Sequence, residues 1–411
     1  MLRYEFLTLD DVEIDGKTVF VRVDVNSPID PESGVIMDDT RIRAVVETLK
    51  DLRRCRTVIG SHQSRPGKGD FTSLEQHAML LRRYTLTPVR FIDDVIGPAA
   101  RQAIRNLKVG EILVLDNLRL CSEENIEDKP EELRKTLFIK RLAPLFDLYV
   151  NDAFAALHRC QPSMLGFTDL MPSVVGRIME RELKAINTVI DNPARPCVFV
   201  LGGAKVEDRL PIIESLLKKG VADKILLGGL LGKAMLKAKG INLGPGSEAD
   251  LKPAENSLKL AEKLIQEHGS SIESPIDLAA DKDGSRTEVD VAKLPLAERT
   301  LDIGRDTIKR YSRIISEAGT VVAEGPMGMF EKSGFEIGTQ GILQAMANAK
   351  GYTVLGGGHL AAIAQLNEMS HRFKHISTGG GAVLTLFTGE RLPVIEALER
   401  AAKRLRGEQS R

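Results

Sequence analysis

The residues best suited to chemistry follow short apolar segments in the first half of the chain, and most of them are basic. Four arginines and one histidine stand there in equivalent positions, namely Arg41, His62, Arg65, Arg119 and Arg159. A guanidinium group offers a planar fork of donors that matches the oxygens of phosphate and carboxylate groups. Asp24 and Asn26 are two residues apart on an extended segment, so they lie on one side, where they can bind hydroxyl groups. A single arginine is most often a surface ion pair, but the set predicts a pocket for a small, highly anionic molecule.

Glycine clusters follow the corresponding apolar segments in the second half of the chain. They are Gly202-Gly203, Gly228-Gly229, residues 356–358 and residues 379–381, and Lys205 stands close behind the first of them. Such clusters let the backbone approach an anion and point N–H groups at it. Tight packing of a strand on a helix also uses glycine, and it explains the pair Gly228-Gly229 equally well. Neither a Walker A loop nor a dinucleotide-binding G-x-G-x-x-G is present, which disfavours an oxidoreductase of that type.

The chain shows no arrangement typical of a dedicated general base, nucleophile or metal site. His371 and His375 have helical spacing, but no acidic third ligand stands near them. G-x-S-x-G and H-E-x-x-H motifs are absent. One half suited to a small polyanion and one suited to a phosphate-rich ligand, without a base, favour phosphoryl transfer by positioning and charge stabilisation.

The elements that must position these residues are short strands and longer helices. Apolar β-branched segments such as residues 19–23 and 197–201 alternate with amphipathic ones throughout the chain. Near-continuous apolar strands separated by helices are typical of parallel sheets covered on both faces, so the predicted class is α/β. Ligands bind at the carboxyl ends of such strands, where the arginines and glycines stand.

A helix near the middle divides the chain into two predicted domains. Met179, Leu183, Ile186 and Ile190 mark one helix face, and Pro193 stops the helix. We expect two Rossmann-like parallel-sheet domains with a substrate cleft between them: residues 1–177, a connecting helix at 178–190, and residues 191–385. The tail, residues 386–411, is expected to pack back on the first domain. The alternative is a crossover helix inside one large sheet.

The composition excludes several classes of protein. The chain has 411 residues, with 57 basic and 57 acidic side chains. Proteins that bind nucleic acid or a membrane surface carry a basic excess, so neither partner is expected. The four cysteines lie far from C-x-x-C spacing, and no signal peptide or membrane-spanning segment is seen. These features predict a cytoplasmic protein.

In the order of its motifs, the chain resembles phosphoglycerate kinase along nearly its whole length. The motifs are R-V-D-x-N-x-P at residues 22–28, R-I-x-A at 41–44, S-H-x-x-R-P at 61–66, D-N-x-R at 116–119, D-A-F-x-x-x-H-R at 152–159, L-G-G-A-K-V at 201–206, G-P-x-G-x-F-E at 325–331 and S-T-G-G-G-A at 377–382. The resemblance implies reversible, Mg²⁺-dependent phosphoryl transfer between 1,3-bisphosphoglycerate and ADP, which gives 3-phosphoglycerate and ATP in glycolysis and gluconeogenesis. The phosphoryl acceptor would be a carboxyl group. A monomer with hinge bending is expected.

The resemblance also implies roles for single residues. The phosphoglycerate would be held by Asp24, Asn26, Arg41, His62, Arg65, Arg119 and Arg159. The nucleotide would be held by Lys205, Gly325, Glu331, Gly357, Gly358, His359 and Leu360. The transferring group would meet Arg41, Lys205 and the amides of Gly379, Gly380 and Gly381.

Several positions depart from the commonest pattern of the family. They are Arg209, where a lysine is usual, Leu230 for glycine, Glu324 for asparagine, His359 for aspartate and Leu360 for threonine. The aspartate is the family's magnesium contact, so the metal ligand in this chain is left unassigned. The changes resemble the archaeal branch of the family. A non-catalytic sensor that binds nucleotide and phosphoglycerate is the alternative.

Overall fold

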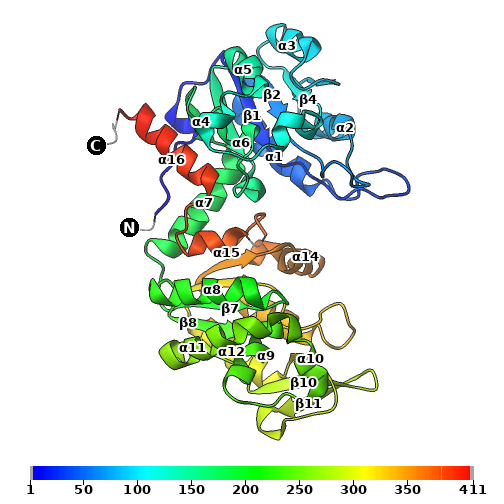
Figure 1. The fold of residues 1–411 in the computed structure, drawn as a ribbon, viewed down its shortest axis with the longest axis vertical. Coiled ribbons are helices and arrows are strands. Elements are labelled where there is room, and N and C mark those ends of the chain that lie inside the picture. The colour runs from blue at the N-terminus through cyan, green and yellow to red at the C-terminus, as the bar shows by residue number, and fades with distance from the viewer. Residues whose placement is uncertain (1–2, 381, 408–411) are drawn as a thin grey trace. The chain divides into compact units, whose positions relative to one another are not determined.

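The structure is a computed structural model that describes residues 3–380 and 382–407. These residues form two compact units (Figure 1). Of the described residues, the first unit contains Tyr4–Lys184 and Arg391–Gly407, and the second contains Ala185–Glu390 and Arg3. The division falls inside helix α7, which spans Arg177–Ile190.

The first unit is built on a parallel sheet of six strands in the order β3-β4-β2-β1-β5-β6. The strands are β1 Thr18–Val23, β2 Arg56–Gly60, β3 Val89–Ile92, β4 Ile112–Leu115, β5 Leu148–Asp152 and β6 Ser173–Val175. The helices are α1 Thr40–Asp51, α2 Glu75–Tyr84, α3 Pro98–Arg105, α4 Pro130–Leu133, α5 Leu137–Leu142, α6 Pro162–Leu165, the first part of α7 and, from the end of the chain, α16 Pro393–Leu405.

Alternation along β1 builds a core on each face of this sheet. Val19, Val21 and Val23 are buried in one hydrophobic cluster, which includes Ala402 of α16. Phe20 points to the opposite face, where its ring lies 4.9 Å from that of Phe167. Successive side chains of a strand point to opposite faces, so a strand whose side chains are buried on both faces needs helices on both.

The second unit repeats this plan with a parallel sheet in the order β15-β14-β13-β7-β8-β9. The strands are β7 Cys197–Leu201, β8 Lys224–Leu227, β9 Ile272–Glu273, β13 Thr320–Glu324, β14 Tyr352–Gly356 and β15 His375–Ile376. The helices are α8 Val206–Lys218, α9 Gly229–Ala238, α10 Pro245–Ala249, α11 Leu258–His268, α12 Arg305–Glu317, α13 Ile337–Asn348, α14 Gly358–Leu366 and α15 Ala382–Phe387. The two parallel α/β sheets confirm the predicted fold class.

An antiparallel sheet of three strands, which the sequence analysis did not predict, completes the second unit. It consists of β10 Asp277–Lys282, β11 Ser285–Asp290 and β12 Thr300–Ile303 in the order β11-β10-β12. The turn between β10 and β11 is Asp283-Gly284, and both residues have positive φ. Asp-Gly is a strong signal for a two-residue hairpin, and this signal was missed.

The end of the chain packs on the first unit, and the segment before it packs in the second. The guanidinium of Arg404 in α16 donates to the carbonyl oxygens of Thr168 and Met171. Phe387 of α15 lies edge-on to Phe199, with the ring centres 5.8 Å apart. The carbonyl of Thr388 accepts a 2.7 Å hydrogen bond from Lys219. The chain therefore stays with the second unit beyond residue 386, the predicted start of the tail.

No helix among the described residues is long and apolar enough to span a bilayer.

Candidate functional site

Basic side chains gather at the carboxyl ends of the first unit's strands. Asp24 directly follows β1, and its carboxylate accepts a 3.0 Å hydrogen bond from the Arg41 guanidinium in the first turn of α1. The backbone N–H of Asn26 donates to the same carboxylate. The Asn26 side-chain oxygen accepts the N–H of Ser64 at 2.7 Å. The loops after β1 and β2 are thereby fixed to each other.

Arg119 lies deeper in this cluster, in the short 3₁₀ turn Leu118–Leu120 that follows β4. It is buried, and its guanidinium donates to the Ser64 carbonyl. Burial lowers its pKa to about 10, helped by the charges of Arg22, Arg159 and Arg65. Arg119 therefore remains cationic at neutral pH, and the arginines that act on it lie nearby.

His62 completes the cluster after β2. Its Nδ1 lies 3.1 Å from a terminal nitrogen of Arg22. Burial holds its pKa well below the usual value, and the charges of Arg22, Arg119, Arg159 and Arg41 act in the same direction. Arg65 is exposed, and Arg159 forms a 3.3 Å ion pair with Glu127. The structure thus brings together all seven residues predicted for the anionic ligand.

Arg22 belongs to this cluster although the sequence analysis assigned it no role. None of its surface is exposed, and its Nε donates a 2.8 Å hydrogen bond to Ser163 Oγ. A charged residue within an otherwise apolar strand was the signal that could have identified it. Buried charges are retained only where partners are available.

Glycines in the second unit have two different kinds of surroundings: some lie against neighbouring loops, and others have open space beside them. A Cβ on Gly202 would lie 2.1 Å from the Pro326 carbonyl, and one on Gly228 would lie 2.6 Å from Met327 Sδ. Gly325, with φ of +81°, would press a Cβ against Gly202 at 2.5 Å. These glycines allow the loops after β7, β8 and β13 to pack together, which supports the packing interpretation of Gly228. A Cβ on Gly358 or Gly380, in contrast, would meet nothing within 4 Å.

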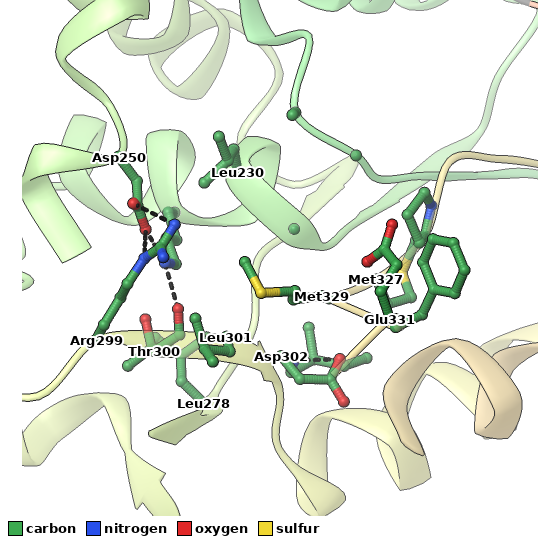
Figure 2. A pocket seen from close by; sticks show the side chains of 18 of the residues that line it. Leu230, Asp250, Leu278, Arg299, Thr300, Leu301, Asp302, Met327, Met329 and Glu331 are labelled. Atoms are coloured by element: carbon green, nitrogen blue, oxygen red, sulfur yellow. Dashed lines mark hydrogen bonds and ion pairs between the residues drawn. The ribbon is translucent and has the colours of Figure 1, made fainter. Parts of the chain in front are cut away.

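A pocket of about 290 Å³ opens beside these packed loops. Its walls are largely apolar and include Leu230, Leu278, Met327, Met329 and Phe330. In Figure 2, Asp250 and Arg299 lie on one side of the pocket and Glu331 lies on the other. An apolar cavity with few polar groups is typical of small-molecule sites, and this one lies at the low end of their size range.

An ion cluster at the Asp250 side of the pocket was not predicted from sequence. The Asp250 carboxylate accepts from Lys233 Nζ at 2.9 Å and from Arg299 Nε at 3.0 Å. Lys233 is buried and also donates to the Thr300 carbonyl. Burial lowers the pKa of Lys233, whereas its bond to Asp250 opposes that shift.

The predicted nucleotide residues are divided between the pocket and its surroundings. Glu331 and His359 line the pocket, and the His359 ring lies 5.4 Å from that of Phe330. Lys205 is exposed at the start of α8. The Leu360 side chain, at the start of α14, is buried in the hydrophobic core of the second unit. Gly325, Gly357 and Gly358 lie at strand or helix ends outside the pocket lining.

The last glycine run is only partly described. The amide of Gly379 donates to Ser377 Oγ at 3.2 Å, and Gly380 has a φ of +57° with open space around it. Gly381, the third glycine predicted to meet the transferring group, lies outside the described residues.

Three of the departures from the common family pattern, Arg209, Glu324 and His359, lie close to one another. Arg209 in α8 forms a buried ion pair with Glu324 at the end of β13. Burial raises the pKa of Glu324, while Arg209, Lys205 and His359 lower it.

Within the parts of the chain that the structure describes, no group of three or more His, Cys, Asp or Glu side chains is arranged to hold a metal ion.

Comparisons with known proteins agree on one family. The family model of phosphoglycerate kinase matches residues 9–390. The phosphoglycerate kinase of Methanothermobacter thermautotrophicus is 46% identical over 96% of this chain and 97% of its own length. That of Saccharolobus solfataricus is 44% identical over 95% and 96%. The predicted resemblance to the archaeal branch is confirmed by these relatives.

Solved structures give the same result. The crystal structure of phosphoglycerate kinase from Pyrococcus horikoshii matches with a TM-score of 0.87 and 39% identity, and covers 97% of this chain and 99% of that one. The structure of the enzyme from Coxiella burnetii matches with a TM-score of 0.81 and 29% identity, over 97% and 100%. On the family model, the relatives and the fold together, this chain belongs to the phosphoglycerate kinase family.

Proposed function

We propose that this chain is a phosphoglycerate kinase that transfers a phosphoryl group reversibly between 1,3-bisphosphoglycerate and ADP. The observation that carries the proposal is the pair of binding features in a member of this family. One unit gathers arginines around Asp24 and Asn26, and the other has a largely apolar pocket beside loops built from glycine. The first suits a small phosphorylated carboxylic acid, and the second suits a nucleotide.

The phosphoryl acceptor in this proposal is a carboxylate, which is ionised at neutral pH and needs no base. The arginine cluster then serves to bind the acid and to stabilise charge as the phosphoryl group moves. Arg65, Arg119 and Arg159 would bind the phosphate that does not react. Arg41, which is already paired with a carboxylate in Asp24, would lie beside the reacting carboxyl group.

The nucleotide would be held by the pocket and by backbone groups near it. Leu230 and Met329 offer apolar contact to the base, and Glu331 offers acceptors to the ribose hydroxyls. Helix N-termini bind phosphate through free N–H groups. The starts of α8 and α14, with Lys205 and Gly357–Gly358, would bind the phosphates in this way.

Magnesium would arrive with the nucleotide. Mg²⁺ usually keeps several waters and is bound by substrate phosphates and one or two carboxylates rather than by a full protein cage. In this arrangement the nucleotide phosphates and waters would supply the ligands, because Glu324 is already paired with Arg209 and Glu331 is placed at the ribose hydroxyls. When bound, Mg²⁺ would neutralise charge on the transferring group.

A coupled assay for ADP formation from 3-phosphoglycerate and ATP tests the proposal. Activity that depends on both substrates supports it. Binding of both ligands without ADP formation would contradict it and favour the sensor instead. We also propose a monomeric, cytoplasmic enzyme without nucleic-acid or membrane partners, for which light scattering of the purified chain gives the oligomeric state.

A further inference from the structure

The Arg22 side chain is fully buried, and each of the three nitrogens of its guanidinium has a partner. Nε donates to Ser163 Oγ at 2.8 Å, one terminal nitrogen donates to the Val23 carbonyl, and the other lies 3.1 Å from His62 Nδ1. A guanidinium has donors and no acceptor, and it is not deprotonated in proteins. In the contact with Arg22, the Nδ1 atom of His62 is therefore the acceptor.

An imidazole that accepts at Nδ1 carries its proton on Nε2 and is neutral. Protonation of Nδ1 would set an N–H group against the guanidinium and leave both without an acceptor. The charges with the largest effect on the pKa of His62 are positive: Arg22 from β1, Arg119 after β4, Arg159 after β5 and Arg41 from α1. These charges and burial oppose a second proton on the ring.

The orientation of Arg22 is fixed by a second layer of buried polar groups. Ser163 Oγ donates to the Glu124 carboxylate, which leaves its lone pairs for Arg22 Nε. The Ser163 amide donates to the other Glu124 oxygen at 2.9 Å. The Tyr149 hydroxyl donates to the Ser163 carbonyl at 2.9 Å. Ser163, Glu124 and Tyr149 are all buried.

We propose that Arg22 holds His62 as a neutral imidazole with its proton on Nε2, and that Ser163 and Glu124 are positioning residues for Arg22. The role of this proton rests on the function proposed above. Nε2–H would donate to an oxygen of the phosphoglycerate, and the positive charge of the site would come from the arginines alone. His62 is then a directional donor whose contribution does not vary with pH in the range where free histidine titrates.

The ring signals of ¹⁵N-histidine in the full-length protein test the protonation state directly. The chain has seven histidines, and His62→Gln identifies the signal of interest. From about pH 5.5 to 8, a range that spans the pKa of free histidine, we expect one protonated nitrogen, Nε2, and one unprotonated nitrogen, Nδ1. Protonation of both nitrogens within this range, or a proton on Nδ1, would overturn the inference.

Ser163→Ala tests the positioning role, because it removes the acceptor of Arg22 Nε without touching His62. We expect the Nδ1–H tautomer or the doubly protonated ring to become populated. We also expect the KM for phosphoglycerate to rise on the order of tenfold, with a smaller change in kcat. Glu124→Gln should act in the same direction, since it weakens the bonds that orient Ser163.

Tyr149→Phe is the matched control. It also removes a buried hydrogen bond to Ser163, but at the carbonyl rather than at Oγ. A general loss of stability would follow from either variant, whereas only Ser163→Ala should change the His62 ring signals. Equal changes in both variants, or no change in either, would remove the positioning role.

The two proposals can fail separately. The ring signals are read without substrate, so they report on His62 even where the wild-type chain forms no ADP, the result that would contradict the proposed function. A wild-type enzyme that forms ADP while His62 takes up a second proton near pH 6.5, the ordinary value, would contradict only the present inference.

Discussion

The guanidinium of Arg209, in the first turns of α8, is paired with the carboxylate of Glu324 at the end of β13. One of its nitrogens donates to Glu324 Oε1 at 2.5 Å, and both side chains are buried. Both positions depart from the commonest family pattern, in which lysine and asparagine are usual. A glutamate buried alone would be costly, and so would an arginine buried without an anion. The two departures therefore compensate each other.

Because the two residues compensate each other, the effects of replacing them on the free energy of unfolding should not be additive. Arg209→Lys and Glu324→Asn should each lower the free energy of unfolding, because each weakens or removes one half of a buried pair. The double variant should recover part of the loss, with a coupling energy on the order of 2 kcal/mol. Urea unfolding of the four proteins gives this value. Strictly additive losses would mean that the pair contributes no coupling.

The Mg²⁺ requirement should depend little on His359. Mg²⁺ prefers oxygen ligands, so an imidazole in place of the family's aspartate is not expected to bind it. His359→Ala should therefore leave the Mg²⁺ concentration for half-maximal rate nearly unchanged, although loss of the contact with Phe330 can weaken nucleotide binding. Titration of the rate with Mg²⁺ at saturating nucleotide measures this. A large rise in the required Mg²⁺ would show that His359 acts at the metal.

Asp152 should make stability depend on pH in an unusual direction. Its carboxylate accepts from Thr48 Oγ1 at 2.5 Å and from the Met179 amide at 2.9 Å, yet burial raises its pKa to about 6. Free aspartate titrates near pH 4. The folded state thus holds this proton more tightly than the unfolded chain does, and ionisation between about pH 4 and 6 lowers the free energy of unfolding.

Asp152→Asn isolates this contribution, because the variant has no proton to lose. Between about pH 4 and 7, the free energy of unfolding of the variant should rise by on the order of 2 kcal/mol relative to that of the wild type. The lost acceptor adds a cost that does not change with pH. Urea unfolding of both proteins at several pH values measures the difference. A difference that stays constant with pH would mean that folded Asp152 is ionised throughout.

The sequence predicted the features that follow from strand ends. Apolar runs such as Val19–Val23 fixed the class as α/β, and parallel strands place their carboxyl ends at one edge. This is why Arg41, His62 and Arg119, though far apart in the chain, lie in one cluster. Their roles toward a ligand stay predictions.

Features that depend on long-range pairing were not predicted. Lys233 and Arg299 meet Asp250 from positions 17 and 49 residues away, and no local pattern connects them. Strand β11 is polar and largely exposed, so it lacks the apolar signal on which the strand prediction relied. Arg22 was overlooked because it stands within an apolar strand. Only the structure shows the buried Ser163 and Glu124 that hold it.

The final prediction separates two arginines of the same cluster. Arg41 is paired with Asp24 at 3.0 Å, whereas Arg65 is exposed in the loop after β2. We place Arg65 at the phosphate that does not react, whose contacts are equal in the ground and transition states. Loss of such a contact mainly raises KM. We place Arg41 beside the transferring group, whose charge changes during the reaction.

Arg41→Ala should therefore lower kcat by roughly a hundredfold or more, as loss of one preorganised donor does elsewhere. Arg65→Ala should chiefly raise the KM for phosphoglycerate. Steady-state kinetics of both variants decide the matter, with circular dichroism to show that each is folded. If both arginine variants lower kcat equally, Arg41 does not have the separate role assigned to it.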